Sequence, residues 1–241
     1  MKIIVTKNYD EMSVKAANII ADIIKAKPDC TLGMATGGTP VGTYNELVNM
    51  TLRGEVSFKR VSTVNLDEYY PISPENPQSY RYFMNENLFD KVDIDKSRTF
   101  VPSGVDENVE RACESHEKVI DQLGIDLQLL GIGRNGHIGF NEPAEELSPF
   151  THLTPLTKDT INANARFFSS EAEVPRHAVT MGMASIFKAK KILLLASGKG
   201  KAEVIKAMVS GGITTGCPAS LLCLHPDVTI ICDEEAYSLL K

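Results

Sequence analysis

Short apolar runs alternate with longer amphipathic segments along almost the whole chain. Most of the runs are continuous and rich in Val, Ile and Leu, which is typical of strands buried on both faces of a sheet. On this pattern we predict strands at residues 3–5, 30–34, 61–65, 127–131, 178–181, 192–196 and 228–232.

Helical patterns fill the spaces between these strands. In the first of them, Ile19, Ile20, Ile23 and Ile24 fall on one side at helical spacing. Alternating strands and helices predict an α/β fold with a mainly parallel central sheet flanked by helices. We predict helices near residues 10–24, 40–52, 79–89, 107–122 and 199–209.

The pattern has no break that suggests a domain boundary. There is no internal repeat, low-complexity segment or linker, so we expect residues 1–241 to form a single α/β domain. Residues 151–177 are less regular and follow directly after the most unusual loop of the chain. They are a candidate mobile lid over a site.

Composition and charge narrow the class of protein. The 241 residues are 43% hydrophobic and 23% charged, as in an ordinary globular protein. No apolar run reaches the roughly 18 residues of a membrane span, and residues 3–5 are too short for the core of a signal peptide. The net charge of -6 gives no support to nucleic-acid binding. Five scattered cysteines without a Cys-x-x-Cys pair predict a cytoplasmic protein without structural zinc.

Ligands of open α/β sheets bind beyond the carboxyl ends of the strands, so the loops after the predicted strands matter most. The first is ATGGTP, in which we expect Thr39 to be the N-cap of the next helix, with Pro40 at its first position. Gly37 and Gly38 let N–H groups converge, and Thr36 and Thr39 add hydroxyls. This arrangement is typical of phosphate binding, with a plain strand-to-helix turn as the alternative.

The second loop places Asp67 and Glu68 directly after a buried strand. Partial desolvation at the mouth of the sheet raises the pKa of a carboxyl group and makes the carboxylate a better base. The alternative is that Asp67 caps the next turn or is solvated. Arg81, near the start of the following helical pattern, is either a substrate contact or a surface charge.

The third loop, GIGRNGHIGFNEP, begins with a G-x-G-x-x-G pattern. A further Gly and a Pro follow so closely that the long helix of a nicotinamide or flavin site is disfavoured. What remains is Asn135, His137 and Glu142 in one glycine-rich loop. His137 can give and take a proton near neutral pH, and Glu142 can hold one ring nitrogen. The alternative is a buried structural histidine.

These three loops together indicate a class of chemistry. The chain has no serine-nucleophile motif and no His-Glu-x-x-His metal motif. We therefore predict an acid/base enzyme with no metal and no cofactor, acting on a phosphorylated small molecule. Asp67 as base and His137 as acid/base suit proton transfer next to a carbonyl group.

Four long motifs in order, LGMATGGTPVGTY, VNLDEYYPI, QSYRYFMNENLF and GIGRNGHIGFNEP, closely resemble the glucosamine-6-phosphate deaminase family of the NagB type. The resemblance continues through LTKDTINANARFF and SGKGKAEVI and covers most of the chain. It implies a modified Rossmann-like fold. It also implies conversion of glucosamine 6-phosphate and water into fructose 6-phosphate and ammonia, an isomerisation and deamination in the catabolism of N-acetylglucosamine.

The resemblance also implies roles for single residues. Asp67 looks like the base that moves a proton between C2 and C1 through an enolamine. His137 looks like the acid/base that opens the pyranose ring, with Asn135 and Glu142 orienting it. The residues that resemble the family's phosphate-binding and substrate-contacting positions are Thr36, Gly37, Gly38, Thr39, Arg166 and Lys201.

The chain departs from the longer members of the family in two ways. They carry Asp where this chain has Asn135, so His137 should be held less strongly as an imidazolium, although Glu142 remains and activity is still expected. They also have an extended C-terminus, whereas this chain ends soon after the strand at 228–232. We therefore expect the short form, a monomer or small homo-oligomer rather than an allosteric hexamer activated by N-acetylglucosamine 6-phosphate.

Two rival functions remain open at this point. A 6-phosphogluconolactonase also binds a hexose phosphate but is a hydrolase that needs no base at C2. A sugar-phosphate sensor could keep the pocket and lose catalysis. The continuous NLDEYY and GRNGHIGFNEP motifs, with Asp67 and His137 both retained, favour the deaminase.

Overall fold

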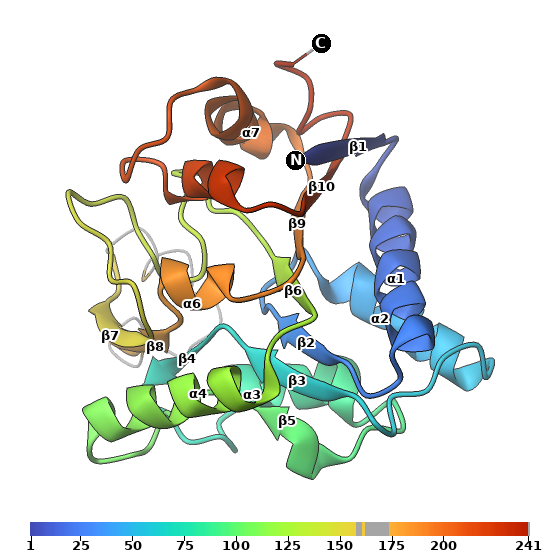
Figure 1. Cartoon of the computed structure of the whole chain (residues 1–241), viewed down its shortest axis with the longest axis vertical. Helices are drawn as coiled ribbons and strands as arrows, with labels where there is room; N and C mark the ends of the chain where they lie inside the picture. Colours follow the sequence, from blue (N-terminus) through green and yellow to red (C-terminus); the bar gives the residue numbers. More distant parts are fainter. Residues whose placement is uncertain (158–160, 162–173, 241) are drawn as a thin grey trace.

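The computed structural model describes residues 1–157, 161 and 174–240, which form an α/β fold around a parallel sheet (Figure 1). This sheet has seven strands in the order β1-β10-β9-β6-β2-β3-β5, and all of its pairings are parallel. Every predicted strand except 178–181 lies in it. The strands are β1 (Lys2–Thr6), β2 (Thr31–Met34), β3 (Ser62–Asn65), β5 (Thr99–Phe100), β6 (Leu127–Leu130), β9 (Ile192–Ala196) and β10 (Val228–Asp233).

Helices cover both faces of this sheet. In Figure 1, α1 (Tyr9–Ala26) and α2 (Val41–Leu52) lie to its right, and α6 (Met183–Phe187) and α7 (Ala202–Ser210) lie to its left. The helix α4 (Val109–Leu123) completes the lower part. Asn8 caps α1 by accepting the N–H of Glu11, and Met12, Ile20 and Ile24 are among the residues that α1 buries.

Two predicted helices are less regular than expected. The segment 79–89 is a short helix α3 (Tyr80–Met84) followed by a π-helical turn (Asn85–Phe89), and 199–209 is a 3₁₀ turn (Lys199–Lys201) followed by α7. The prediction that Thr39 is an N-cap is wrong. Pro40 is the residue that flanks α2, and no side chain caps this helix end. The Thr39 hydroxyl is therefore not used in capping.

A second sheet was not expected from the sequence. It is antiparallel, in the order β4-β8-β7, and consists of β4 (Asp67–Tyr70), β7 (His152–Pro155) and β8 (His177–Thr180). The prediction that residues 178–181 join the parallel sheet is therefore wrong. Asp67 and Glu68 lie in a strand rather than a loop, because β4 finds its partner β8 far away along the chain.

The small sheet has its own apolar cluster, which includes Tyr69, Ile72, Phe140, Leu156 and Val174. This cluster is separate from the main core, which lies between the parallel sheet and its helices. The candidate lid at 151–177 begins as strand β7 and ends at β8, while residues 158–160 and 162–173 lie outside the described part of the chain. The single-domain prediction stays a prediction.

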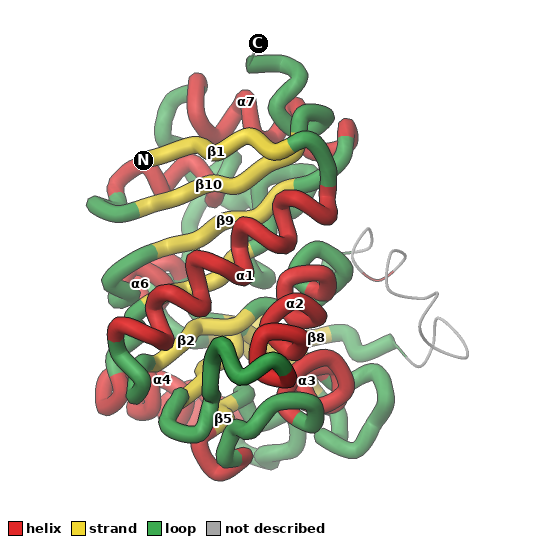
Figure 2. The backbone as a smooth tube through the Cα atoms, turned by 90° about the vertical axis from the view of Figure 1, so that its right-hand side faces the viewer, coloured by secondary structure: helices red, strands yellow, loops and turns green. Residues whose placement is uncertain are grey.

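The described part of the chain contains no helix that is both long and apolar enough to cross a membrane. Figure 2 shows the strands of the parallel sheet stacked edge to edge, with α1 in front of them. Because these strands run in one direction, the segments that follow β2, β3, β6 and β9 all emerge at the same end of the sheet. This end carries the site.

Candidate active site

A cavity of about 850 Å³ opens at the carboxyl ends of the strands. The segments that follow β2, β3 and β6 line it, together with the turn after β9 and Thr157 after β7. Nine of the residues singled out in the sequence lie in its wall, namely Thr36, Gly37, Gly38, Thr39, Asp67, Asn135, His137, Glu142 and Lys201. The tenth, Arg166, lies outside the described residues.

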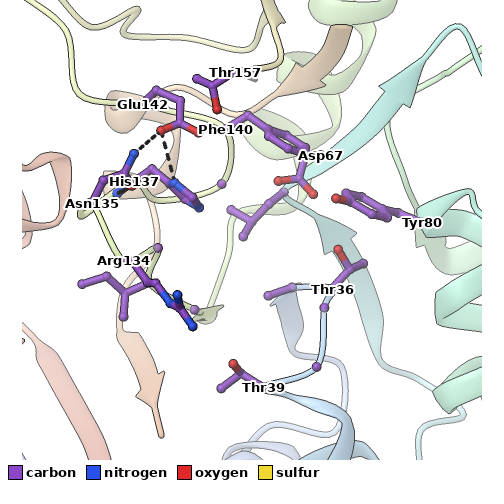
Figure 3. A pocket seen from close by; sticks show the side chains of 18 of the residues that line it. Thr36, Thr39, Asp67, Tyr80, Arg134, Asn135, His137, Phe140, Glu142 and Thr157 are labelled. Atoms are coloured by element: carbon purple, nitrogen blue, oxygen red, sulfur yellow. Dashed lines mark hydrogen bonds and ion pairs between the residues drawn. The ribbon is translucent and has the colours of Figure 1, made fainter. Parts of the chain in front are cut away.

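Asp67 is the first residue of β4 and is only 6% exposed. It is therefore not a solvated surface carboxylate. Burial raises its pKa to about 8, and the neighbouring charge of Glu68 contributes in the same direction. Figure 3 shows its carboxyl group pointing into the cavity opposite His137. A carboxylate with a pKa this high is a strong base once it is ionised.

Glu68 faces away from the cavity and has a different task. Its carboxylate accepts the backbone N–H groups of Tyr69 at 2.9 Å, Tyr80 at 2.8 Å and Arg81 at 2.9 Å. Burial raises its pKa to about 7, against the opposing effect of these three hydrogen bonds. These hydrogen bonds connect the start of α3 to β4. They also fix the position of the strand residue next to Asp67.

His137, Glu142 and Asn135 form a connected group on the opposite wall (Figure 3). The His137 Nδ1 lies 3.3 Å from Oε2 of Glu142, as the sequence suggested. The hydrogen bonds of Asn135 go to Glu142 and to the backbone of His137 rather than to the ring. Asn135 donates its amide N–H to the same Glu142 oxygen at 2.6 Å, and its own oxygen accepts the His137 backbone N–H at 3.2 Å.

The glycines of this loop explain how the ring fits. A Cβ on Gly133 would lie 2.3 to 2.5 Å from three atoms of the His137 ring, so only glycine lets the imidazole rest on the backbone. Gly136 and Gly139 have φ values of +88° and +59°, which L side chains rarely adopt. Nδ1 lies towards Glu142, and no described residue forms a hydrogen bond with the His137 Nε2.

The loop at residues 36–39 forms the floor of the cavity. Gly37 has φ +91°, and a Cβ on Gly37 or Gly38 would meet no atom within 4 Å, so the backbone here is open to a ligand. The hydroxyl of Tyr44 bonds to both backbone groups of Ala35, and the hydroxyl of Tyr9 accepts the Gly42 N–H at 2.8 Å and donates to the Gly38 carbonyl at 3.1 Å. Two tyrosines therefore set the shape of this loop.

Lys201 reaches the cavity from the turn after β9. Its ammonium group donates to the carbonyl of Ile132 at 2.7 Å. Burial lowers its pKa, and the positive charge of Arg134 lowers it further. Among the described residues, no three His, Cys, Asp or Glu side chains gather as a metal site requires.

Three polar side chains of the cavity wall were not predicted from the sequence, namely Tyr80, Arg134 and Thr157. Arg134 stands inside the GIGRNGHIGFNEP motif, and its place between β6 and His137 was a signal that it faces the site. Tyr80 points towards Asp67 and is in ring contact with Tyr69, with ring centroids 4.7 Å apart. No local pattern marks Thr157.

The question left open for Arg81 is settled by its contacts. Its guanidinium donates to the hydroxyl of Thr99 at 2.7 Å and to the Thr99 carbonyl at 2.8 Å. Arg81 does not line the cavity. It ties α3 to β5 and is neither a substrate contact nor a free surface charge.

Comparisons with known proteins agree with this geometry. Residues 7–231 match the family model described as glucosamine-6-phosphate isomerases/6-phosphogluconolactonase. A glucosamine-6-phosphate deaminase of Clostridium perfringens is 59% identical over 242 residues, covering 100% of both chains. One from Thermoanaerobacter pseudethanolicus is 56% identical over 241 residues, covering 100% of this chain and 95% of the other.

Solved structures extend the comparison to the fold. A monomeric glucosamine-6-phosphate deaminase has a TM-score of 0.96 and 48% identity, covering 99% of this chain and 100% of that chain. The 6-phosphogluconolactonase of Trypanosoma brucei has a TM-score of 0.79 and 19% identity, covering 100% of this chain and 98% of that chain. The second likeness shows the fold alone. The expected modified Rossmann-like α/β fold is confirmed.

Proposed function

We propose, from the premise that the chain belongs to the family of glucosamine-6-phosphate isomerases and 6-phosphogluconolactonases, that it converts glucosamine 6-phosphate and water into fructose 6-phosphate and ammonia. The deaminases compared above resemble it along its whole length. The likeness to the lactonase, at 19% identity, is evidence for the fold alone. The enzyme is thus an isomerising deaminase, and hydrolase is a loose label for it.

The observation that carries this proposal is a buried carboxyl group that faces, across one cavity, an imidazole with a carboxylate beside it. Burial gives Asp67 a pKa of about 8, while His137 lies 3.3 Å from Glu142. Lactone hydrolysis needs no base at a carbon atom. Isomerisation of an aldose needs one group to open the ring and another to move a proton between C2 and C1, and this site offers both.

The first step is ring opening. His137 Nε2 takes the proton of the C1 hydroxyl and delivers a proton to the ring oxygen, so that the C1–O5 bond breaks and the aldehyde forms. Glu142 lies 3.3 Å from Nδ1 of His137, on the side of the ring away from the transfers, and helps to fix the orientation of the ring. Asn135 keeps Glu142 in place through its hydrogen bond.

The second step is isomerisation. The aldehyde makes the C2 proton acidic. Ionised Asp67 takes this proton while the C1 carbonyl oxygen gains a proton from the C2 ammonium group, which gives the enolamine. The ammonium group on C2 favours the ionised form of Asp67, because a nearby positive charge stabilises a carboxylate. Return of a proton to C1 gives an imine at C2. Water adds to that carbon, and ammonia leaves to form fructose 6-phosphate.

The test of the proposed function is an assay for both products. Purified protein with glucosamine 6-phosphate at neutral pH is expected to release ammonia and form fructose 6-phosphate in equal amounts. The same protein with 6-phosphogluconolactone is expected to give no more acid than spontaneous hydrolysis. Acceleration of lactone hydrolysis without ammonia release would overturn the proposal in favour of the lactonase.

The ring-opening role of His137 has its own test. His137→Gln is expected to reduce kcat on glucosamine 6-phosphate at least a hundredfold, because the ring must open before C2 becomes acidic. Exchange of the C2 proton of an acyclic analogue should fall much less. Asn18→Asp, on the exposed surface of α1, is a control for general effects of substitution. Equal losses on both substrates would remove His137 from ring opening.

We also propose that the protein acts in the cytoplasm, in the catabolism of N-acetylglucosamine, as a monomer or small homo-oligomer. All five cysteines are free, which suits a reducing compartment. A sugar phosphate is charged and is retained inside cells. The solved deaminase that resembles this chain over its whole length is monomeric. Accumulation of glucosamine 6-phosphate in cells lacking this protein, grown on N-acetylglucosamine, would support the pathway.

A further inference from the structure

Two cationic side chains share one side of the cavity. Arg134 comes from the loop after β6, and Lys201 from the turn after β9. A Cβ on Gly200 would lie 3.5 Å from Nε of Arg134 and 3.6 Å from its Nη2, so the guanidinium rests against the turn that carries Lys201. The two charges are close enough for Arg134 to lower the pKa of Lys201.

Neither cation is neutralised by the described part of the protein. Arg53, Arg111 and Lys188 all pair with carboxylates, whereas no Asp or Glu among residues 1–157, 161 and 174–240 forms an ion pair with Arg134 or Lys201. The hydrogen bond from Lys201 goes to a neutral carbonyl. Two like charges held together without a counterion favour the binding of an anion.

The geometry also shows where that anion would lie. In Figure 3, the Arg134 side chain points from its loop towards the Thr36 and Thr39 side of the cavity. The backbone there is open at Gly37 and Gly38. An anion between the two walls is met by N–H groups and hydroxyls on one side and by two cations on the other.

We propose that Arg134 is a phosphate-binding residue of this enzyme, which grips the dianionic phosphate of the substrate together with Lys201 and opposite the loop at 36–39. This rests on the proposed function, since that function makes the substrate a phosphate monoester. Such a group carries about −1.5 to −2 charges at pH 7. A guanidinium matches it with two parallel hydrogen bonds, which a single ammonium cannot form.

Arg134 acts in binding and not in proton transfer. It stands next to Asn135, but its guanidinium makes no hydrogen bond to Asn135, His137 or Glu142 among the described contacts. Loss of its charge should therefore weaken the hold on the phosphate in the ground state and in the transition state alike. Such uniform binding appears in KM and leaves kcat unchanged.

The test compares Arg134→Gln with the wild-type enzyme. We expect KM for glucosamine 6-phosphate to rise at least tenfold and kcat to stay within about twofold. The inhibition constant of inorganic phosphate should rise by a similar factor, and Arg134→Lys should fall between the two proteins. Arg60→Gln is the matched control, because Arg60 is exposed, 3.7 Å from Asp29, before the amino end of β3.

The pH dependence separates binding of the dianion from a structural effect. The second pKa of a phosphate monoester is about 6. In the wild type, KM should rise as the pH falls below that value, because the monoanion is held less strongly. In Arg134→Gln this rise should be smaller. A variant that merely loosened the loop would keep the wild-type pH dependence, and that result would overturn the proposal.

The remaining outcomes distinguish this proposal from the proposed function. If the wild type releases ammonia and Arg134→Gln keeps its KM and its phosphate inhibition, Arg134 is not a phosphate ligand, and the deaminase assignment stands. If Arg134→Gln loses kcat with KM unchanged, Arg134 instead positions the His137 loop, and the proposal is wrong. If the wild type releases no ammonia, both proteins can still be titrated with inorganic phosphate. A lower affinity for phosphate in Arg134→Gln than in the wild type supports the role of Arg134, and equal affinities overturn it.

Discussion

At the scale of single residues, Asp67 shows how the fold disfavours the ionised form that the chemistry needs. The side chain is buried beside Glu68, and its pKa is raised from 3.8 to about 8. The native state therefore binds a proton more tightly than the unfolded chain does. The corresponding contribution to stability is present below pH 3.8 and is lost as the pH rises through about 8.

Asp67→Asn should therefore separate activity from stability. The variant is expected to lose exchange of the C2 proton, because an amide is no base. Its melting temperature should exceed that of the wild type, and the gap should widen between pH 5 and pH 8, since each pH unit adds about 1.4 kcal/mol. In a protein of this size, each kcal/mol of unfolding free energy shifts the melting temperature by roughly 2–4 °C.

The measurement is thermal melting from pH 5 to pH 9. Asp22→Asn serves as the control, because Asp22 is exposed on α1 and its removal should shift the melting temperature equally little at every pH. A constant difference between Asp67→Asn and wild type across this range would contradict the raised pKa. Normal C2 exchange in Asp67→Asn would remove Asp67 as the base.

Much at this scale could be predicted from local sequence. His137 and Glu142 are five positions apart in one glycine-rich loop, so a contact between them needs no distant partner. The opposite directions of the Asp67 and Glu68 side chains could not be predicted. Adjacent residues of a strand point to opposite faces, and the strand itself was not foreseen.

At the scale of elements, the loop at 36–39 is shaped by the helices around it. Tyr9, at the start of α1, uses its hydroxyl to join the Gly38 carbonyl and the Gly42 N–H. Tyr44, in the first turns of α2, holds Ala35 in the same way. The glycines allow the loop several backbone conformations, and the hydroxyls of Tyr9 and Tyr44 stabilise one of them.

Tyr9→Phe tests this arrangement. The change removes two hydrogen bonds and keeps the ring, so the loop should sample other shapes before the substrate binds. We expect KM to rise about three- to tenfold with little change in kcat, because part of the binding energy goes into ordering the loop. Steady-state kinetics and inhibition by inorganic phosphate measure this.

Tyr237→Phe is the matched control for Tyr9→Phe. Tyr237 is half-buried near the C-terminus, and its ring packs against the main core. The substitution Tyr237→Phe should leave KM for glucosamine 6-phosphate unchanged. An unchanged KM in Tyr9→Phe as well would show that the glycine loop keeps its shape without the hydroxyl of α1.

The small antiparallel sheet could not be predicted, for a physical reason. Its strands β4, β7 and β8 are each four residues long and pair only with one another, as in Glu68 with Val179 and Leu153 with Val179. The strand β8 was predicted, but in the parallel sheet. The pairing of β4 with β8 spans more than a hundred positions, so no local periodicity indicates it. The long helices α1 and α4 were predicted to within a few residues, because their apolar stripes repeat along the chain itself.

At the scale of the whole molecule, the cavity brings together, among the described residues, the groups that the proposed chemistry uses, which are Asp67, His137 and the loop at 36–39. We therefore expect the proposed monomer to have full activity. The protein should elute from a sizing column as one chain of 241 residues, and its specific activity should not depend on its concentration.

The contrary result is equally clear. A larger assembly whose specific activity falls on dilution would show that contacts between subunits support the site. Addition of N-acetylglucosamine 6-phosphate provides a second readout, since a monomer should show hyperbolic kinetics with and without it. Sigmoidal kinetics relieved by that sugar would contradict the expected short, non-allosteric form.

The sequence by itself determined the parallel α/β architecture, the chemistry of the three loops and their meeting at one end of the sheet. These follow from periodicity and from the direction of parallel strands, which are properties of short segments. Only the tertiary structure decided how deeply Asp67 is buried and that Glu68 accepts hydrogen bonds from the start of α3. It also decided that Tyr9 and Tyr44 shape the loop at 36–39 and that Arg134 lies beside Lys201. Each of these depends on contacts between different elements of the fold, because such contacts set the solvent exposure and the electrostatic environment of a side chain.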